Sequence, residues 1–262
     1  MSNTRATNDN LLVSPKWLAD HLNDPDVRVV EVTPAGAGYV LGHIPGAIFF
    51  DLDEALPGLD VPVEKVTRLL STHGLSPDKR IVIYDEIGGQ RAAQAFWLLE
   101  YLGFPRVSVL EGGIERWMAE GHRQTRLQPQ VEPTPFEPSL RQDRIASADW
   151  VAAHLQDESV VLVDSRGPEE FAEGHIPGAR NRPFENTLVL GAHQQFRPAD
   201  DLNREFADLG ASTEREVVTY CGSGRRSSHT YLTLRWLGYP RVRNYKGSWD
   251  EWQTRLDLPQ ER

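Results

Sequence analysis

The most constraining feature of this sequence is that it contains the same pattern twice. His-Ile-Pro-Gly-Ala occurs at residues 43–47 and again at residues 175–179. Leu-Gly-Phe-Pro-Arg-Val at residues 102–107 returns as Leu-Gly-Tyr-Pro-Arg-Val at residues 237–242, so the motifs keep their order. Solenoid repeats are about 20–45 residues long, which makes this period too long for a solenoid. We therefore expect two tandem copies of one domain of roughly 120 residues.

Each half alternates strands with helices. The expected strands are short β-branched runs, apolar on both faces as in a buried parallel sheet: Val27–Val32, Arg80–Tyr84, Val160–Val163 and Glu216–Tyr220. The expected helices are Ala92–Leu102, a helix through Leu155 capped by Ser147, and Ser227–Leu237 with Gly238 as its stop. This alternation predicts an α/β fold of two tandem domains, each a mainly parallel sheet flanked by helices.

A proline-rich stretch separates the two copies. Residues Gln128–Ser139 include four prolines and few apolar side chains, which is typical of an extended, semi-rigid linker. The expected organisation is an N-terminal domain of residues 1–127, a linker of residues 128–145 and a C-terminal domain of residues 146–262.

The composition excludes several classes of protein. Hydrophobic residues make up 39% of the chain, enough to bury a core, which excludes general disorder. The formal net charge of −10 gives no global attraction to nucleic acid or to an anionic membrane, so neither is an expected partner. No run approaches the ~18 apolar residues of a membrane span, and residues 1–10 lack the pattern of a signal peptide. We expect a cytoplasmic protein and, because two domains already form one unit, a monomer.

The chain has a single cysteine, Cys221, which excludes an internal disulfide and a cysteine-rich zinc site. A lone cysteine is either a small buried core residue or a reactive thiol, so its surroundings must decide. The eight histidines show no paired metal spacing. No metal or organic cofactor is implied.

The surroundings of Cys221 favour a reactive thiol. Cys221 follows an expected strand and precedes an expected helix, at the strand end where α/β sheets bind ligands. The residues between are Gly222, Ser223, Gly224, Arg225 and Arg226. The glycines allow a tight loop with inward-pointing amides, and the helix dipole and two guanidinium groups add positive charge. All of these features would stabilise a thiolate and bind an anion above it.

The length of this loop narrows the chemistry. Four residues separate Cys221 from Arg226, whereas cysteine phosphatases and arsenate reductases use five around a whole oxyanion. A loop shorter by one residue makes a tighter ring of amides. Such a ring suits one terminal sulfur atom on the thiolate, a persulfide, better than a phosphate.

Three motifs together resemble those of the tandem-domain rhodaneses, a family of sulfurtransferases. They are Val163–Arg166 followed by the turn Gly174–Ala179, the loop Cys221–Arg226, and the later segment Gly247–Trp252. The resemblance implies two rhodanese-like domains with the active cysteine only in the second. It also implies that Cys221 takes the outer sulfur of a donor such as thiosulfate. The resulting persulfide would pass its sulfur to cyanide, another thiol or a protein such as thioredoxin.

The resemblance also implies roles within the loop and beside it. The amides of residues 222–226 would hold the persulfide sulfur, and Arg225 and Arg226 would bind the thiosulfate dianion. Asp164 and Arg166 would support the loop, although a structural ion pair explains Arg166 equally well.

Two further assignments concern the pocket wall and the first half of the chain. Ser248 and Trp249 would line the wall, and Trp249 could equally belong to an interface core. Asp85 stands where the second half has Cys221, and a carboxylate there would repel an anion. The N-terminal domain is therefore expected to be catalytically inactive.

Two donors and one different class of protein stay open. The loop begins Cys-Gly-Ser-Gly, as in 3-mercaptopyruvate sulfurtransferases, but it ends with two arginines. Residues 167–174 also lack the longer arginine-containing insert of those enzymes. Both features favour thiosulfate as the donor. A non-catalytic sulfur carrier or binding module would have the same loop without turnover.

Overall fold

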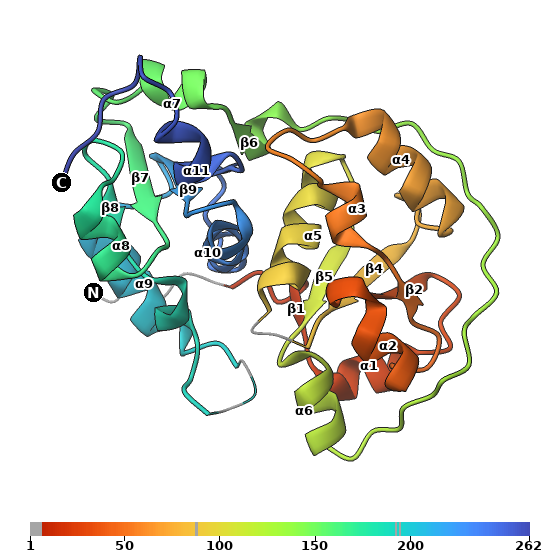
Figure 1. The fold of residues 1–262 in the computed structure, drawn as a ribbon. Coiled ribbons are helices and arrows are strands. Elements are labelled where there is room, and N and C mark those ends of the chain that lie inside the picture. Colours follow the sequence, from red (N-terminus) through yellow and green to blue (C-terminus); the bar gives the residue numbers. More distant parts are fainter. Residues whose placement is uncertain (1–6, 87–88, 192, 194) are drawn as a thin grey trace. The chain divides into compact units, whose positions relative to one another are not determined.

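The computed structural model describes residues 7–86, 89–191, 193 and 195–262, which form two compact units (Figure 1). The N-terminal unit is Asp9–Arg141 with the described part of Leu190–Gln195. The C-terminal unit is Gln142–Val189 and Phe196–Arg262, with the described residues before Asp9.

Each unit contains one five-stranded sheet, and the two sheets have the same topology. In the N-terminal unit the strand order is β1 (Leu12–Val13), β5 (Val107–Leu110), β4 (Arg80–Tyr84), β2 (Val27–Glu31) and β3 (Ile48–Phe49). In the C-terminal unit it is β6 (Ile145–Ala146), β10 (Val242–Tyr245), β9 (Glu216–Tyr220), β7 (Val160–Asp164) and β8 (Arg180–Asn181). Neighbouring strands pair in parallel, with β2 in register with β4 and β7 with β9 over five residues each.

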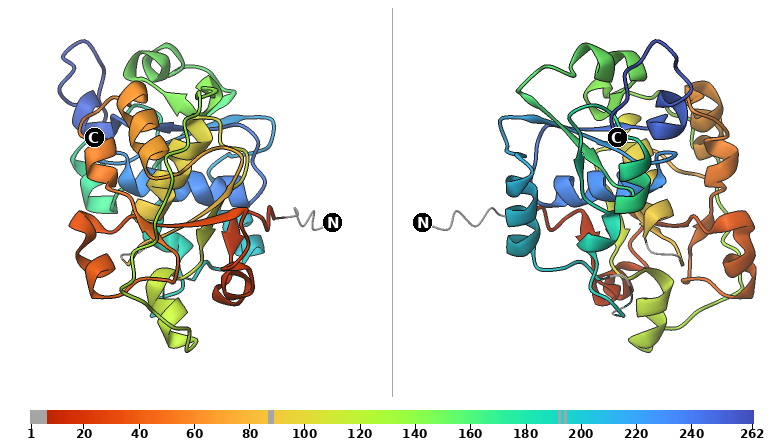
Figure 2. Two further views of the ribbon diagram at one scale, coloured as in Figure 1. Left: turned by 90° about the vertical axis from the view of Figure 1, so that its right-hand side faces the viewer. Right: turned by 60° about the vertical axis from the view of Figure 1, so that its left-hand side comes forward.

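Helices lie on both faces of each sheet (Figure 2). The N-terminal unit has α1 (Pro15–His21), α2 (Ala37–Leu41), α3 (Leu52–Ala55), α4 (Val63–Thr72), α5 (Gln90–Tyr101) and α6 (Gly113–Ala119), with a 3-10 turn at Pro34–Gly36. The C-terminal unit has α7 (Ala148–Ala153), α8 (Pro168–Glu173), α9 (Ala199–Asp208), α10 (Arg225–Trp236) and α11 (Ser248–Trp252), with 3-10 turns at Gln142–Arg144 and Phe184–Thr187. This arrangement confirms the predicted α/β fold of two tandem domains with parallel sheets.

The helices α5 and α10 begin two residues earlier than the sequence pattern predicted. Each is preceded by a glycine in the left-handed region, Gly89 with φ of 71° and Gly224 with φ of 89°. A left-handed residue ends the incoming loop sharply, so the next residue already takes helical geometry. The consequence is that Arg225 and Arg226 belong to the first turn of α10 and not to the loop.

Helix α7 ends two residues before the predicted end at Leu155. Its predicted cap is confirmed, because the Ser147 hydroxyl accepts the Trp150 amide at 3.1 Å. At the other end the His154 ring nitrogen Nδ1 lies 2.7 Å from the Trp150 carbonyl oxygen, which the next helical amide would otherwise use. The expected strand ends differ from those observed by a single residue, Val32 instead of Glu31 and Val163 instead of Asp164.

Equivalent tryptophans close the core of each unit. Trp117 in the N-terminal unit and Trp252 in the C-terminal unit are buried in the two hydrophobic clusters. Each indole N–H donates to a backbone carbonyl further along the chain, that of Arg123 at 3.0 Å and that of Pro259 at 2.8 Å. The repeated motif thus places the same large side chain, with the same kind of partner, beneath both sheets.

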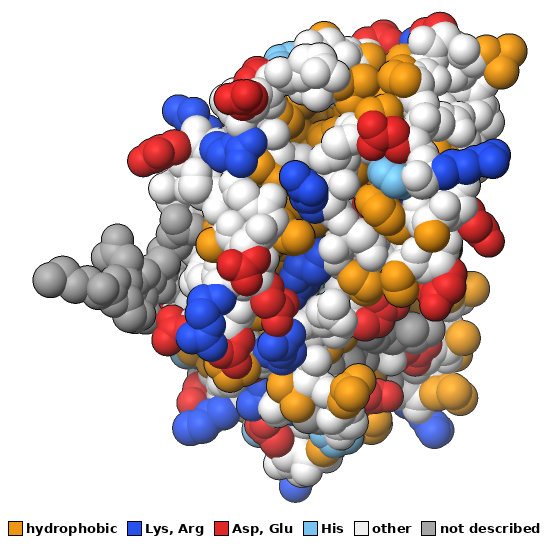
Figure 3. Space-filling view, turned by 90° about the vertical axis from the view of Figure 1, so that its left-hand side faces the viewer, with side chains coloured by type: hydrophobic (Ala, Val, Ile, Leu, Met, Phe, Trp, Pro, Cys, Tyr) orange, Lys and Arg blue, Asp and Glu red, His pale blue; other side chains and the backbone are white. Residues whose placement is uncertain are grey.

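On the face shown in Figure 3, Lys and Arg side chains lie interspersed with Asp and Glu side chains. In the described part of the chain, every helix is too short or too polar to cross a lipid bilayer.

Candidate active site

Cys221 is the first residue after the central strand β9 and is almost fully buried, with 1% of its surface exposed. Its Sγ atom accepts a hydrogen bond from the Gly224 amide at 3.2 Å. We call residues Cys221–Gly224 the cysteine loop. The loop therefore turns back on itself so that at least one backbone N–H points at the sulfur, an arrangement that suits a negative charge on that atom.

The start of α11 holds the cysteine loop in place. The Cys221 amide donates to Ser248 Oγ at 3.1 Å, and the Trp249 amide donates to the Cys221 carbonyl at 3.0 Å. The Asp250 amide donates to the Gly222 carbonyl at 2.9 Å. Ser248 itself has a left-handed φ of 54°, and its hydroxyl donates to the Tyr245 carbonyl at 2.7 Å. A strained residue held by hydrogen bonds thus positions the backbone of the candidate nucleophile.

Only glycine fits at residue 224. Its φ of 89° disfavours any side chain, and an added Cβ would lie 2.7 Å from the Lys246 carbonyl oxygen. The Gly224 carbonyl also accepts the Ser228 hydroxyl at 2.6 Å. The residue whose amide contacts the sulfur is therefore fixed both by the lack of space beside Lys246 and by the hydrogen bond from Ser228.

Arg226 is tied to a carboxylate. Its two terminal nitrogens donate to the two oxygens of Glu170 at 2.6 and 2.7 Å, a bidentate ion pair. This contact with Glu170, together with the nearby charge of Cys221, raises the pKa of Arg226 above its usual range. The Arg226 contact also lowers the pKa of Glu170. Arg225 and Ser223 are exposed.

Asp164 and Arg166 form a buried ion pair beside the loop. Arg166 Nη2 donates to Asp164 Oδ2 at 2.7 Å, and both side chains are at most 4% exposed. The same nitrogen donates to the Gly174 carbonyl at 2.7 Å, and the guanidinium lies 4.9 Å from the centre of the Trp249 ring. Asp164 and Arg166 thus connect the end of β7 with the turn before β8 and with Trp249, and these are the contacts of a structural ion pair.

Glu170 and Asn244 are two further residues beside the cysteine loop that the sequence pattern does not reveal. Glu170 was one of several acids in a short connection, and nothing in the local pattern pairs it with Arg226, 56 residues away. Asn244, fully buried on β10, accepts the Ser227 hydroxyl at 2.7 Å and donates to the Ser228 hydroxyl at 3.0 Å. It thereby fixes the first turn of α10 behind the cysteine loop. The sequence carried no clear signal for Asn244, because it lies in the mixed run Val242–Tyr245, whose strand structure and burial only the fold shows.

In the N-terminal unit the Asp85 side chain takes up the backbone amides at the equivalent place, between β4 and α5. The Asp85 carboxylate accepts the Gly89 amide at 3.1 Å on one oxygen and the Arg91 and Ala92 amides, each at 2.9 Å, on the other. Asp85 is 1% exposed, and its carboxylate accepts two amides of the first turn of α5, as a helix-capping side chain does, although the N-cap residue itself is Gly89. We call the connection from Asp85 to Gly89 the aspartate loop. Three backbone amides at its end and in the first turn of α5 already bind a carboxylate that belongs to the protein.

No cluster of three or more His, Cys, Asp or Glu side chains suited to a metal ion occurs among the described residues.

A comparison with known protein families identifies the fold. The rhodanese-like domain pattern matches residues 14–120 and 147–255. The chain therefore belongs to the rhodanese family, as a protein with two rhodanese-like domains in tandem.

Three similar proteins indicate which kind of rhodanese-family protein this chain is. The chain is 36% identical to a thiosulfate sulfurtransferase of Azotobacter vinelandii, covering 96% of this chain and 97% of the relative. It is 33% identical to the sulfur carrier protein TtuD of Thermus thermophilus, covering 95% of each. The crystal structure of the 3-mercaptopyruvate sulfotransferase SseA from Escherichia coli superposes with a TM-score of 0.81 at 27% identity, covering 91% of this chain and 98% of SseA. Within its family this chain is a sulfurtransferase.

Proposed function

We propose that the protein transfers the outer sulfur of thiosulfate to cyanide or another thiophilic acceptor through a persulfide on Cys221. The observation that carries this proposal is the buried Sγ of Cys221 at the carboxyl end of β9, with the Gly224 amide aimed at it. A thiolate needs such donors in place of water, and one extra sulfur atom needs only a small, tight loop.

The reaction has two displacement steps. The Cys221 thiolate attacks the outer sulfur of thiosulfate, the sulfur–sulfur bond of thiosulfate breaks, and sulfite leaves with the electron pair. A Cys221 persulfide anion remains. The cyanide carbon then attacks its terminal sulfur, thiocyanate leaves, and the thiolate is regenerated. Because Cys221 is the single cysteine, no second thiol of this chain can take the sulfur.

The donor preference follows from the charge at the loop. Thiosulfate is a dianion, and Arg225 and Arg226 supply two cationic groups at the start of α10. The Glu170 carboxylate balances the charge of Arg226, so the loop is less positive than its sequence implies. The Cys-Gly-Ser-Gly start of the loop and the likeness to SseA favour 3-mercaptopyruvate as the second candidate donor.

The N-terminal unit is proposed to be inactive in sulfur transfer. Asp85 offers no thiol, and its carboxylate already accepts three backbone amides. An incoming anion would meet a like charge at the same position.

The test is steady-state turnover with thiosulfate and with 3-mercaptopyruvate, using cyanide as acceptor, for the wild type and Cys221→Ala. We expect thiocyanate to form with a higher kcat/KM from thiosulfate, and mass spectrometry before cyanide addition to find one added sulfur atom on Cys221. A higher kcat/KM with 3-mercaptopyruvate would make 3-mercaptopyruvate, instead of thiosulfate, the proposed donor. A persulfide that forms without turnover would indicate a sulfur carrier, as TtuD is named. Equal rates for both proteins would overturn the enzymatic proposal.

A further inference from the structure

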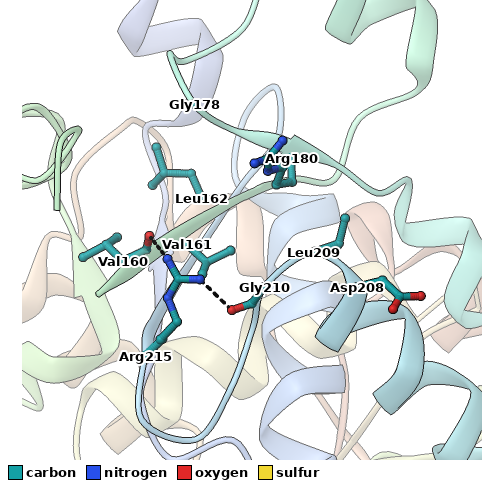
Figure 4. A pocket seen from close by; sticks show the side chains of 9 residues that line it. All are labelled: Val160, Val161, Leu162, Gly178, Arg180, Asp208, Leu209, Gly210 and Arg215. Carbon is teal, nitrogen blue, oxygen red and sulfur yellow. Dashed lines mark hydrogen bonds between the residues drawn. The ribbon is translucent and has the colours of Figure 1, made fainter. Parts of the chain in front are cut away.

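The C-terminal unit has an open pocket at the beginning of strand β7, with a volume of about 490 Å³. Its lining comes from β7, the segment around β8, the end of α9 and the loop before β9 (Figure 4): Val160, Val161, Leu162, Gly178, Arg180, Asp208, Leu209, Gly210 and Arg215. None of these residues belongs to the candidate active site, and the proposed sulfur transfer does not use them.

The internal repeat identifies the equivalent place in the N-terminal unit. Ile48 stands in β3 where Arg180 stands in β8, one residue after each His-Ile-Pro-Gly-Ala motif. Gly74 follows α4 as Gly210 follows α9, and both glycines are left-handed, with φ of 66° and 87°. The same surface is therefore present in both units, built on the same backbone.

In the N-terminal unit an extended piece of the linker lies on this surface. Gln128, Pro129 and Val131 line one pocket with Ile48 and His73, the residue before Gly74. The contact is close. A Cβ added to Gly74 would meet the Glu132 carbonyl at 3.0 Å, and the Thr134 amide donates to the Ser71 carbonyl at 2.9 Å. The fold thus uses this surface to hold an extended, proline-containing segment.

The C-terminal surface has a different charge. Arg180 replaces the apolar Ile48, is exposed, and its guanidinium makes no hydrogen bond or ion pair with the described residues. The Arg215 guanidinium lies in the pocket wall, donating to the Gly210 carbonyl at 2.9 Å and contacting the Val160 carbonyl at 3.4 Å (Figure 4). The lining therefore contains two cationic side chains, those of Arg180 and Arg215, and one carboxylate, that of Asp208. This excess of positive charge in the lining favours a negatively charged ligand.

We propose that this pocket is a docking site for an extended, proline-containing acidic segment of a partner protein. The segment would take the path that the linker takes over the N-terminal unit. It would carry a carboxylate near Arg180, at the position where the linker has Val131, which lines the same pocket as Ile48. Affinity would come from the shape shared by the two units and specificity from the charge that only the C-terminal unit has.

The test uses two fluorescein-labelled peptides and fluorescence anisotropy with the full chain. One peptide has the sequence of residues 126–137, and the other carries Val131→Glu. We expect the acidic peptide to bind the wild type, and Arg180→Glu to weaken that binding about tenfold or more. Arg204→Glu is the matched control, because Arg204 lies on α9 outside the pocket with a 74% exposed side chain. It should change binding less than about twofold.

A second variant, Arg180→Ile, gives the C-terminal surface the apolar residue that the N-terminal surface has. This variant should bind the peptide of unchanged sequence more tightly than the Val131→Glu peptide. Unfolding midpoints of all variants verify that they fold. Absence of binding at millimolar protein, or binding of the acidic peptide that does not respond to Arg180, would overturn the proposal. The second result would place the peptide elsewhere, for example on the N-terminal unit in place of the linker.

Discussion

Strands β4 and β9 occupy the same central place in their sheets, but the residue that follows is Asp85 in one unit and Cys221 in the other. Both loops end in a left-handed glycine that starts a buried helix. In the N-terminal unit three amides, from Gly89 and the first turn of α5, point at the Asp85 carboxylate, whereas in the C-terminal unit the Gly224 amide points at a sulfur.

The same arrangement of backbone amides at a helix start can therefore either stabilise the fold or support a reaction. Amides at a helix start bind a negative charge, and the sequence decides whether the protein supplies that charge itself. Asp85 satisfies the amides permanently and stabilises α5. Under the proposed function, Cys221 leaves room for a sulfur atom that arrives and leaves. The difference in length matters too, because the aspartate loop has one residue more before its glycine.

The largest effect is expected when the cysteine loop is given the residue of the aspartate loop. Cys221→Asp removes the nucleophile and puts a carboxylate at the loop amides, so thiocyanate formation should fall at least ~1000-fold. Steady-state kinetics and intact-mass measurement after thiosulfate treatment test this. A variant that keeps a tenth of the wild-type rate would show that the thiol is not the sulfur-accepting group.

The converse change tests the structural role in the N-terminal unit. Asp85→Ala leaves buried amides at the start of α5 without their acceptor, so the free energy of unfolding should fall by about 3 kcal/mol. Urea unfolding gives the loss, and hydrogen exchange of the Arg91 and Ala92 amides locates it. Asp85→Asn keeps one acceptor oxygen and should lose less. If all three proteins were equally stable, the carboxylate would not be the cap.

The next comparison is between Arg226 and Arg91, the second residues of α10 and α5. Arg226→Ala should lower kcat/KM for thiosulfate about 30-fold, because the anion loses a charge-assisted contact. Alkylation of Cys221 by neutral iodoacetamide should change less than about threefold. Equal losses in both assays would mean that Arg226 acts on the thiol and not on the donor. The control is Arg91→Ala, the equivalent residue, which pairs with Asp53 at 2.7 Å and should leave kcat/KM within about twofold.

The helices after the loops should differ in their response to acid. Burial lowers the pKa of His229 on α10 to about 3, and its Nδ1 has no hydrogen-bond partner among the described residues. The unfolded chain takes up this proton below about pH 6.5, but the folded chain does not until about pH 3. Unfolding therefore binds a proton in this range, and stability falls by about 1.4 kcal/mol per pH unit as the pH drops.

The equivalent residue on α5 is Gln94, which does not titrate. His229→Gln should therefore remove most of this pH dependence, as measured by urea unfolding at pH 7.5 and pH 5.5. An unchanged difference between the two pH values would assign the effect to other groups.

The smallest effect concerns the carboxylate that holds Arg226. Glu170→Gln removes a negative charge next to the loop, so the KM for thiosulfate should fall about threefold while kcat stays within about twofold. Glu169→Gln is the matched control, since Glu169 is the neighbouring exposed residue of α8. The same fall in KM for both variants would indicate general electrostatics instead of the specific ion pair.

Much of this protein can be predicted from its sequence because the relevant signals are local or repeated. The duplication predicted two domains, the β-branched runs predicted the strands, and the position of Cys221 between a strand and a helix placed it at the edge where ligands bind. The resemblance of three ordered motifs then indicated the family, which the comparisons confirm.

Tertiary structure decided the contacts that no spacing encodes. Three such contacts depend on how separate elements pack. They are the ion pair between Arg226 and Glu170, the hydrogen bond from the Cys221 amide to Ser248, and the burial of the Asp85 carboxylate among backbone amides. The proposed role of Arg180 likewise depends on tertiary structure, because it is inferred from the linker that covers the equivalent surface of the N-terminal unit. The sequence by itself determined the fold and the location of the thiol, since both depend on residue type and order. Packing decided which charges are balanced and which surface stays open, because those depend on distances between residues far apart in the chain.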